Sequence, residues 1–321
     1  MTGTTDERPA PRRSTRFRLT VLGCAVLPLC FAGWLGWQAL AGDGPARAAD
    51  TSSAVPPTSD VTFDAPTAWP TALASATPSP GGTASPATTA PGTAGHPLTG
   101  RTVLLDPGHN TGNGRHTTEI NRQVDIGNSR KECDTTGTST DSGYSEAEYT
   151  LDVSHRARAL LEARGAKVVF TQDGDRAWGP CIDERARIGN DAHADAAVSV
   201  HGDGAPASGS GFHVIMPAKV TAGKADTSAI VAPSHRLGLL LRDSFKAATG
   251  EPYADYIGEQ ALDTRSDLGG LNLSRIPKVF IECGNMRNSG DAKRMTDPQW
   301  RQQAAQGIAD ALTAYLTTPA G

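Results

Sequence analysis

Two histidines and two glutamates stand in this sequence where a strand-like run ends or a helix-like run begins. His109 follows "VLLDPG", Glu146 opens the run after "DSGYS", His201 ends "AAVSVH" and Glu282 ends "PKVFIE". Two imidazoles and one carboxylate with an open position are the donor set of a catalytic Zn²⁺, and a further carboxylate can handle the protons of its water. These residue types therefore predict a metal-assisted hydrolytic centre.

Each of the four residues also has an ordinary structural explanation when taken alone. His109 and His201 could be hydrogen-bonded loop histidines, and Glu146 could be a favourable charge at a helix N-terminus. Glu282 could end its strand in an ion pair. It fits that explanation least well, because burying a glutamate inside "VFIECG" costs several kcal/mol unless a cation compensates.

The elements that must position these side chains alternate between strand and helix. Short apolar runs predict strands at 102–106, 167–171, 196–201, 211–217 and 277–284, and helical spacing predicts helices at 146–164, 182–192, 234–249 and 298–316. This pattern is typical of an α/β domain with one central mixed sheet flanked by helices on both faces. Such sheets build their sites at the carboxyl ends of strands, where His109, His201 and Glu282 are expected.

Four motifs in order, "VLLDPGHN", the acidic residue before the first long helix, "AAVSVHGD" and "IPKVFIECGNMRN", resemble the zinc-dependent N-acetylmuramoyl-L-alanine amidases of the amidase-3 type. That family cleaves peptide stems from bacterial peptidoglycan, and the resemblance spans about Leu98 to Leu316. It implies an amidase-3 fold, with His109, Glu146 and His201 as zinc ligands and Glu282 as the catalytic acid/base. Glu148 is the alternative to Glu146, two residues further on. "GLNLSRIP" and the two loop cysteines resemble the actinobacterial branch.

The resemblance implies hydrolysis of the amide between N-acetylmuramic acid and L-alanine, for cell-wall remodelling or turnover. Two alternatives remain: a non-catalytic peptidoglycan-binding or regulatory protein of the same fold, and a zinc peptidase that cuts within the stem peptide. The partner in each case is peptidoglycan or its muropeptides. The small formal charge of −4 does not indicate a nucleic-acid partner. We expect the chain to act as a monomer.

The first 97 residues predict export of the domain that follows. A basic stretch leads into the apolar run 19–42, which reads either as a cleaved signal peptide, with Ala39-Leu40-Ala41 as its cleavage pattern, or as an uncleaved membrane anchor. Residues 43–97 are rich in Ala, Pro, Thr and Ser and predict a disordered linker. The expected order is thus a signal or anchor at 1–42, the linker at 43–97 and the catalytic domain at 98–318, outside the cytoplasm in either case.

The expected location outside the cytoplasm bears on the oxidation state of the cysteines. Cys133 and Cys181 lie in loop-like stretches of a protein expected in an oxidising compartment, so we predict that they form a disulfide. Cys283 lies among strand residues and is expected to be a buried thiol.

Several polar residues near the motifs have open roles. Asp106 either orients His109 or is an ordinary turn residue before Pro-Gly. Arg265, Asn285 and Arg287 are candidates for binding stem-peptide carboxylates. His155 and His213 are expected to face solvent. The loop 110–142 is long enough to line or cover the cleft.

Overall fold

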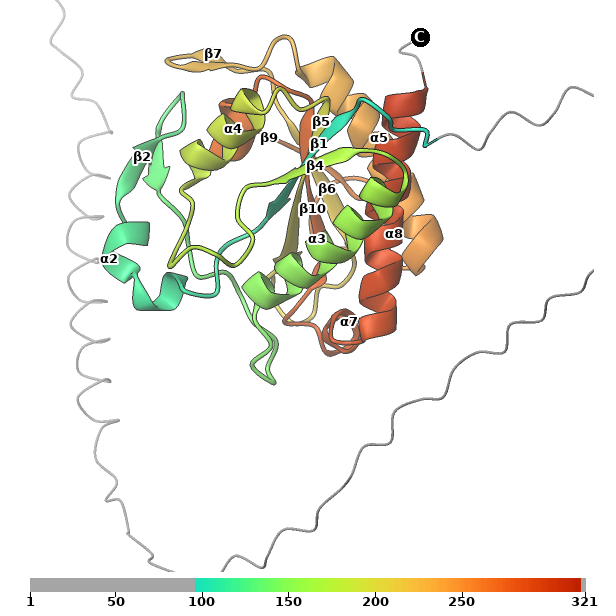
Figure 1. Cartoon of the computed structure of the whole chain (residues 1–321). Helices are drawn as coiled ribbons and strands as arrows, with labels where there is room; N and C mark the ends of the chain where they lie inside the picture. Colours follow the sequence, from blue (N-terminus) through green and yellow to red (C-terminus); the bar gives the residue numbers. More distant parts are fainter. Residues whose placement is uncertain (1–95, 319–321) are drawn as a thin grey trace, which may run out of the picture. The chain divides into compact units, whose positions relative to one another are not determined.

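The computed structural model describes residues 96–318, which form an α/β domain built on one six-stranded sheet (Figure 1). The signal or anchor segment predicted at 1–42 lies outside the described residues, as does the linker up to residue 95. No helix within 96–318 is both long and apolar enough to cross a membrane.

The sheet has the strand order β4-β1-β5-β10-β6-β9. Its strands are β1 (Thr102–Pro107), β4 (Lys167–Phe170), β5 (Ala196–Asp203), β6 (His213–Pro217), β9 (Leu262–Arg265) and β10 (Lys278–Asn285). Only the β10–β6 pair is antiparallel, so the sheet is mixed, as predicted. Two small hairpins, β2 (Gln123–Asp125) with β3 (Arg130–Glu132) and β7 (Thr221–Ala222) with β8 (Ala225–Asp226), lie outside it.

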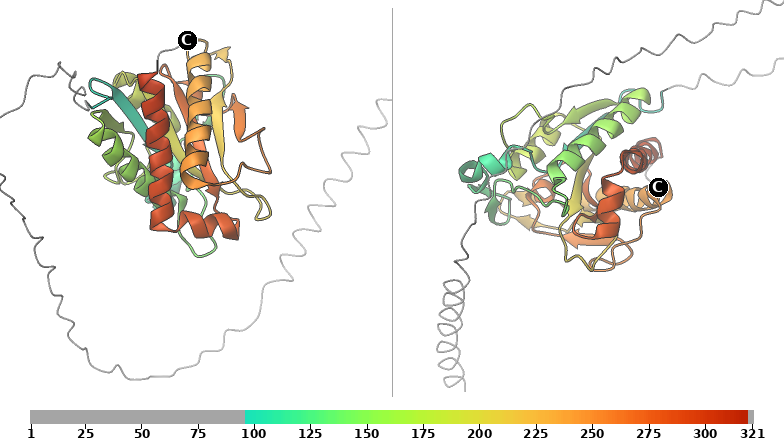
Figure 2. Two further views of the ribbon diagram at one scale, coloured as in Figure 1. Left: turned by 90° about the vertical axis from the view of Figure 1, so that its right-hand side faces the viewer. Right: turned by 90° about the horizontal axis from the view of Figure 1, so that it is seen from below.

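The helices cover both faces of the sheet. The long ones are α3 (Glu146–Ala163), α4 (Ile182–Asp191), α5 (Val231–Thr249) and α8 (Pro298–Thr317), and the short ones are η1 (Asn113–Arg115), α2 (Thr117–Ile120), α6 (Gly269–Asn272) and α7 (Ser289–Met295). Helices α3, α5 and α8 lie on one face, which we call the three-helix face (Figures 1 and 2). Helix α4 covers the opposite face together with α6.

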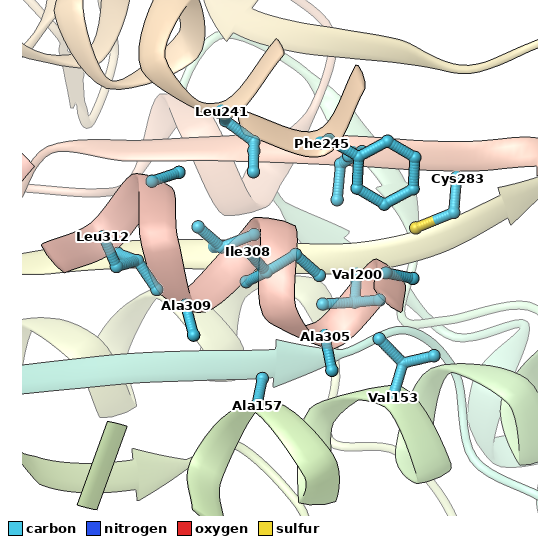
Figure 3. Packing of buried hydrophobic residues seen from close by; sticks show 14 of the residues in the cluster. Val153, Ala157, Val200, Leu241, Phe245, Cys283, Ala305, Ile308, Ala309 and Leu312 are labelled. Atoms are coloured by element: carbon cyan, nitrogen blue, oxygen red, sulfur yellow. The ribbon is translucent and has the colours of Figure 1, made fainter. Parts of the chain in front are cut away.

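The main hydrophobic core lies on the three-helix face. Figure 3 shows Val153 and Ala157 of α3 opposite Ala305 and Ala309 of α8, and Phe245 of α5 packs into the same cluster. Small alanines on α8 let this helix approach its neighbours closely. Cys283 contributes its buried free thiol to this layer, as predicted.

Strand alternation decides which side chains reach the other face. In β5, Val198 and Val200 belong to the main core, so Ser199 and His201 point toward the α4 side. In β10, Ile281 belongs to the main core and Glu282 to the α4 side. The parallel β5 and β10 are hydrogen-bonded neighbours with Glu282 directly opposite His201. Because side chains alternate between the two faces along each strand, His201 and Glu282 lie on the same face of the sheet and at the same edge.

Every predicted strand and long helix is present, with ends that differ by a few residues. The predicted disulfide Cys133–Cys181 is also present. The edge strand β9 and the two hairpins were not predicted from the sequence. Their segments are short and polar, so they carry no apolar periodicity.

Candidate metal centre

His109, Glu146 and His201 converge at the carboxyl ends of β1 and β5. Glu146 Oε1 lies 3.1 Å from His109 Nε2 and 2.9 Å from His201 Nδ1. The two imidazole rings meet edge to face with their centroids 5.1 Å apart. All three donor atoms lie within 4.8 Å of one another. The structure therefore brings together three residues that are far apart in the sequence.

Glu146 reaches this point because it is the first residue of α3. Ser145 caps the helix: its hydroxyl accepts a hydrogen bond from the Glu148 N–H, and the Glu148 carboxylate accepts one from the Ser145 N–H. Glu148 is exposed, and its carboxylate is engaged in this capping interaction. Glu146 is buried, and its carboxylate also accepts hydrogen bonds from the N–H groups of Thr138 and Gly202.

The donor set and its surroundings fit a zinc ion. With metal–ligand bonds of about 2.0–2.2 Å, tetrahedral donors stand roughly 3.4 Å apart. The Glu146 oxygen lies close to this separation from each histidine nitrogen, at 3.1 and 2.9 Å. Burial opposes a charge on His109, yet the Glu146 and Asp134 carboxylates raise its pKa well above the usual value. Burial likewise opposes ionisation of Glu146, but His109 and His201 hold its pKa well below the usual range. These shifts show that the histidines and the acidic side chains stabilise one another, and that the Glu146 carboxylate is held ionised.

Glu282 lies beside the three donors and lines the same cavity, of about 320 Å³, as His109, Glu146 and His201. Its Oε2 is buried and has no hydrogen-bond partner among the described residues. Burial and the nearby carboxylates of Glu146 and Asp203 raise the pKa of Glu282 well above its usual range. A carboxyl group whose pKa is raised in this way takes up a proton more readily than an exposed glutamate does, which suits a group that accepts and then returns a proton.

Two cavities meet at the histidines. The first is the cavity that contains Glu282, and Arg265 lies on its wall. The second, of about 210 Å³, extends toward α4 and α6 and is lined largely by apolar surface, including Leu268 and Phe280. The Phe280 ring stacks on His201 with 5.1 Å between centroids. Thr135 lines both cavities, Gly137 and Thr138 line the first, and Lys131, Glu132 and Asp134 line the second, so the loop 110–142 lines the site.

The sequence matches a family model described as N-acetylmuramoyl-L-alanine amidase, Amidase_3, over residues 103–314. The chain belongs to the amidase-3 family.

Relatives place this amidase-3 chain beside actinobacterial members. It is 41% identical over 223 residues to the N-acetylmuramoyl-L-alanine amidase Rv3717 of Mycobacterium tuberculosis, covering 69% of this chain and 88% of that protein. The crystal structure of the amidase Ami1 from Mycobacterium smegmatis is similar, with a TM-score of 0.63 and 40% identity over 68% of this chain and 98% of that one. The apo form of Ami1 from Mycobacterium abscessus gives a TM-score of 0.63 with 42% identity, over 68% of this chain and 100% of that one.

Asp106 does not contact the imidazole of His109, and it is a buried residue of β1 and not an ordinary turn residue, so neither role expected from the sequence was right. Asp106 is buried and binds Lys278 Nζ at 2.7 Å and Arg185 at 2.9 Å. The His109 ring instead contacts Asp134 and Thr135. Asp134 was not predicted from the sequence as a contact of His109, although it directly follows Cys133 of the predicted disulfide.

The candidates for binding stem-peptide carboxylates separate in the structure. Arg265 lines the cavity beside Glu282 and is paired with Asp267 at 2.8 Å. Arg287 lines neither cavity and pairs with Asp141. Asn285 is buried, and both hydrogens of its amide are donated to the carbonyls of residues 206 and 209. Asn285 therefore cannot bind a substrate, and that prediction was wrong.

Two further histidines, His155 and His213, differ in their exposure. His155 is partly exposed and pairs with Asp173 on the surface, as expected. His213 is only 2% exposed, so the expectation that it faces solvent was wrong. It lies directly opposite Glu282 in the antiparallel β10–β6 pair, and the ring of Tyr256 packs edge-on against it.

Proposed function

We propose that this chain is a zinc-dependent N-acetylmuramoyl-L-alanine amidase that acts on peptidoglycan outside the cytoplasm. The observation that carries the proposal is the convergence of His109, Glu146 and His201 with the half-buried Glu282 in one cavity of an amidase-3 domain. His109 would bind the ion through Nε2, His201 through Nδ1 and Glu146 through Oε1. The relatives named as amidases support the choice of bond.

Bound zinc would supply Lewis acidity here, lowering the pKa of a water molecule and polarising the substrate carbonyl. Glu282 accepts a proton from the attacking water as a bond forms to the lactyl carbonyl carbon of N-acetylmuramic acid. It then donates that proton to the L-alanine nitrogen as the carbon–nitrogen bond breaks. The products are the lactyl carboxylate and a free peptide amino terminus, so atoms and protons balance.

The site has room for substrate on both sides of the reacting bond. One cavity contains Glu282 and Arg265, the other extends toward α4 and α6, and Phe280 lines both. Both open at His109 and His201, so an amide placed at the donors would extend one substituent into each cavity. Arg265 is positioned to bind a carboxylate of the substrate on the Glu282 side.

The test is metal analysis combined with product identification on intact muropeptides. We expect the zinc-loaded protein to release peptides that begin with L-alanine, identified by mass spectrometry. Cleavage at a bond inside the stem would instead establish a stem peptidase, and binding without cleavage would establish a recognition module.

Replacing Glu282 by glutamine tests the assigned role of this carboxyl group. Glu282→Gln should keep bound zinc and lose about 10²–10⁴-fold in kcat, because general acid/base catalysis contributes that much. Glu162→Gln, an exposed position on α3, is the matched control and should retain full activity. Turnover by Glu282→Gln at the wild-type rate would show that another group moves the proton.

A further inference from the structure

We propose that the Cys133–Cys181 disulfide, Asp134 and Arg185 form a positioning device for His109. The inference rests on the proposed function, because it takes His109 to be a zinc ligand. His109 Nδ1 faces three oxygens: the Thr135 carbonyl at 3.1 Å, the Thr135 hydroxyl at 3.3 Å and Asp134 Oδ1 at 3.3 Å. These acceptors keep the proton on Nδ1 and leave the Nε2 lone pair free on the side of Glu146.

Arg185 connects the backbone of His109 to Asp134. Its Nη2 donates to the His109 carbonyl at 2.9 Å and to Asp134 Oδ2 at 3.1 Å. Its Nη1 and Nε donate to Asp106 Oδ1, to the Pro107 carbonyl and to the Pro180 carbonyl. The guanidinium is buried and its planar group of donors fixes these acceptors relative to one another.

The backbone of His109 needs this support. Its φ is 61°, in the left-handed region, which a residue with a Cβ adopts only when its surroundings hold it there. Its carbonyl is held by Arg185 and by the Gln172 side-chain amide, which donates at 3.2 Å. Both the backbone and the ring of His109 are therefore restrained from the side away from Glu146.

The disulfide links the loop that carries Asp134 to the helix α4 that carries Arg185. Cys133 directly precedes Asp134, and Cys181 is the N-cap of α4, one turn before Arg185. The Ile182 N–H donates to the Cys133 carbonyl at 2.7 Å, and the Arg185 N–H donates to the Cys181 carbonyl at 2.9 Å. The covalent bond therefore sets the separation of the loop and the helix that hold His109 between them.

The first experiment measures zinc affinity by competition with a chromophoric chelator, using the full chain. Asp134→Ala should weaken zinc binding about 10–100-fold, the usual effect of removing a partner of a ligating histidine. Asp134→Asn keeps one acceptor oxygen, so it should weaken zinc binding less than Asp134→Ala does. It should still weaken binding relative to wild type, because one oxygen cannot accept from both His109 and Arg185. Asp141→Asn is the control, since this aspartate lies on the same loop with its side chain 79% exposed and should bind zinc as wild type does.

The second experiment separates positioning from a merely structural role. The Co²⁺-substituted protein reports the geometry of the ligands through its visible absorption bands. These bands should shift in Asp134→Ala and Asp134→Asn and remain unchanged in Asp141→Asn. Circular dichroism at the same temperature establishes that each variant is folded, so that affinity is compared between folded proteins.

The third experiment tests the disulfide. The protein is reduced by a phosphine, the reductant is removed without oxygen, and zinc affinity is measured before and after re-oxidation. Reduction should weaken binding at least several-fold and re-oxidation should restore it. The Cys133→Ser/Cys181→Ser double variant should show the weaker affinity and no response to the phosphine.

The outcomes separate this inference from the proposed function. A wild-type protein that binds no zinc would overturn both. A wild-type protein that binds zinc and cleaves the muropeptide, with Asp134→Ala and the reduced protein equal to it in zinc affinity and Co²⁺ spectrum, would overturn the positioning role alone.

Discussion

The side chains of Glu146 and His201 in the candidate metal centre are held by contacts with atoms outside the donor group. Glu146 accepts hydrogen bonds from the N–H groups of Thr138 and Gly202. The His201 ring lies against Phe280. These contacts restrict the rotamers of the donors before any ion binds, which lowers the entropy lost on binding. The site also needs space for the two imidazole rings, and this space depends on small neighbouring residues.

Gly108 is the residue whose size matters most directly. A Cβ at this position would lie 2.8 Å from Nε2 of His201, and nearer still to its Cε1 and Nδ1 atoms. Real Cβ atoms do not approach other heavy atoms so closely. The side chain that would have to move is a donor itself, enclosed by Glu146 and Phe280. The glycine of "DPGH" is thus required by the close approach of a neighbouring strand.

Gly108→Ala should weaken zinc binding about tenfold or more, equal to about 1.4 kcal/mol or more, because His201 must leave its position. Chelator competition measures this. Gly114→Ala is the matched control: nothing lies within 4 Å of a Cβ at this glycine, and zinc affinity should not change. Wild-type affinity in Gly108→Ala would show that the His201 ring is free to shift without cost.

The site depends on where helix α3 begins. The capping box of Ser145 and Glu148 sets the first turn, and this places Glu146 at the first helical position, with its side chain in the cavity. The two glutamates therefore have separate tasks. Glu148 stabilises the end of the helix, and Glu146 faces the imidazoles.

The two glutamates give a reciprocal prediction. Glu148→Ala should lower the free energy of unfolding by about 0.5–2 kcal/mol, the usual cost of a lost cap interaction, and leave zinc affinity unchanged. Glu146→Gln should lose zinc binding while the cap persists. Urea unfolding followed by circular dichroism and chelator competition measure both quantities. If Glu148→Ala lost zinc and Glu146→Gln kept it, the ligand would be Glu148.

At the scale of the whole molecule, the sequence predicts the positions of the donors better than their supports. Parallel strands end at one edge of a sheet, so His109 and His201 could be placed together from strand patterns alone. Asp134 lies in a loop without periodicity, and only the tertiary fold brings it to His109. The sequence predicts that His213 faces solvent, yet β9 pairs with its strand and Tyr256 packs against its ring. The segment "LDTR" that forms β9 has no apolar run that would reveal the strand.

The same tertiary fold assembles a buried ionic cluster beneath the site. Asp106 of β1 binds Lys278 of β10 and Arg185 of α4, and it accepts hydrogen bonds from Thr171 and Ser199. Asp106 and Lys278 are each only 1% exposed. Burial alone would raise the pKa of Asp106, but Lys278 and Arg185 hold it well below the usual range. One carboxylate therefore joins two strands and a helix.

Asp106→Asn should lower the free energy of unfolding at pH 7 by about 3–5 kcal/mol, because Lys278 is left buried with no anionic partner.

The pH dependence of the stability has a definite sign. A carboxylate whose pKa is depressed on folding stabilises the native state above its unfolded pKa, near 3.8, and that contribution is lost as the pH falls below this value. Wild type should therefore lose stability below about pH 4 with a steeper slope than Asp106→Asn, by up to about 1.4 kcal/mol per pH unit for one proton. Urea unfolding at pH 7, 4 and 3 measures both effects, and Asp243→Asn, 61% exposed in its side chain, should match wild type at each pH. Equal slopes in wild type and Asp106→Asn would show that other carboxylates govern acid unfolding and that the cluster does not couple to pH.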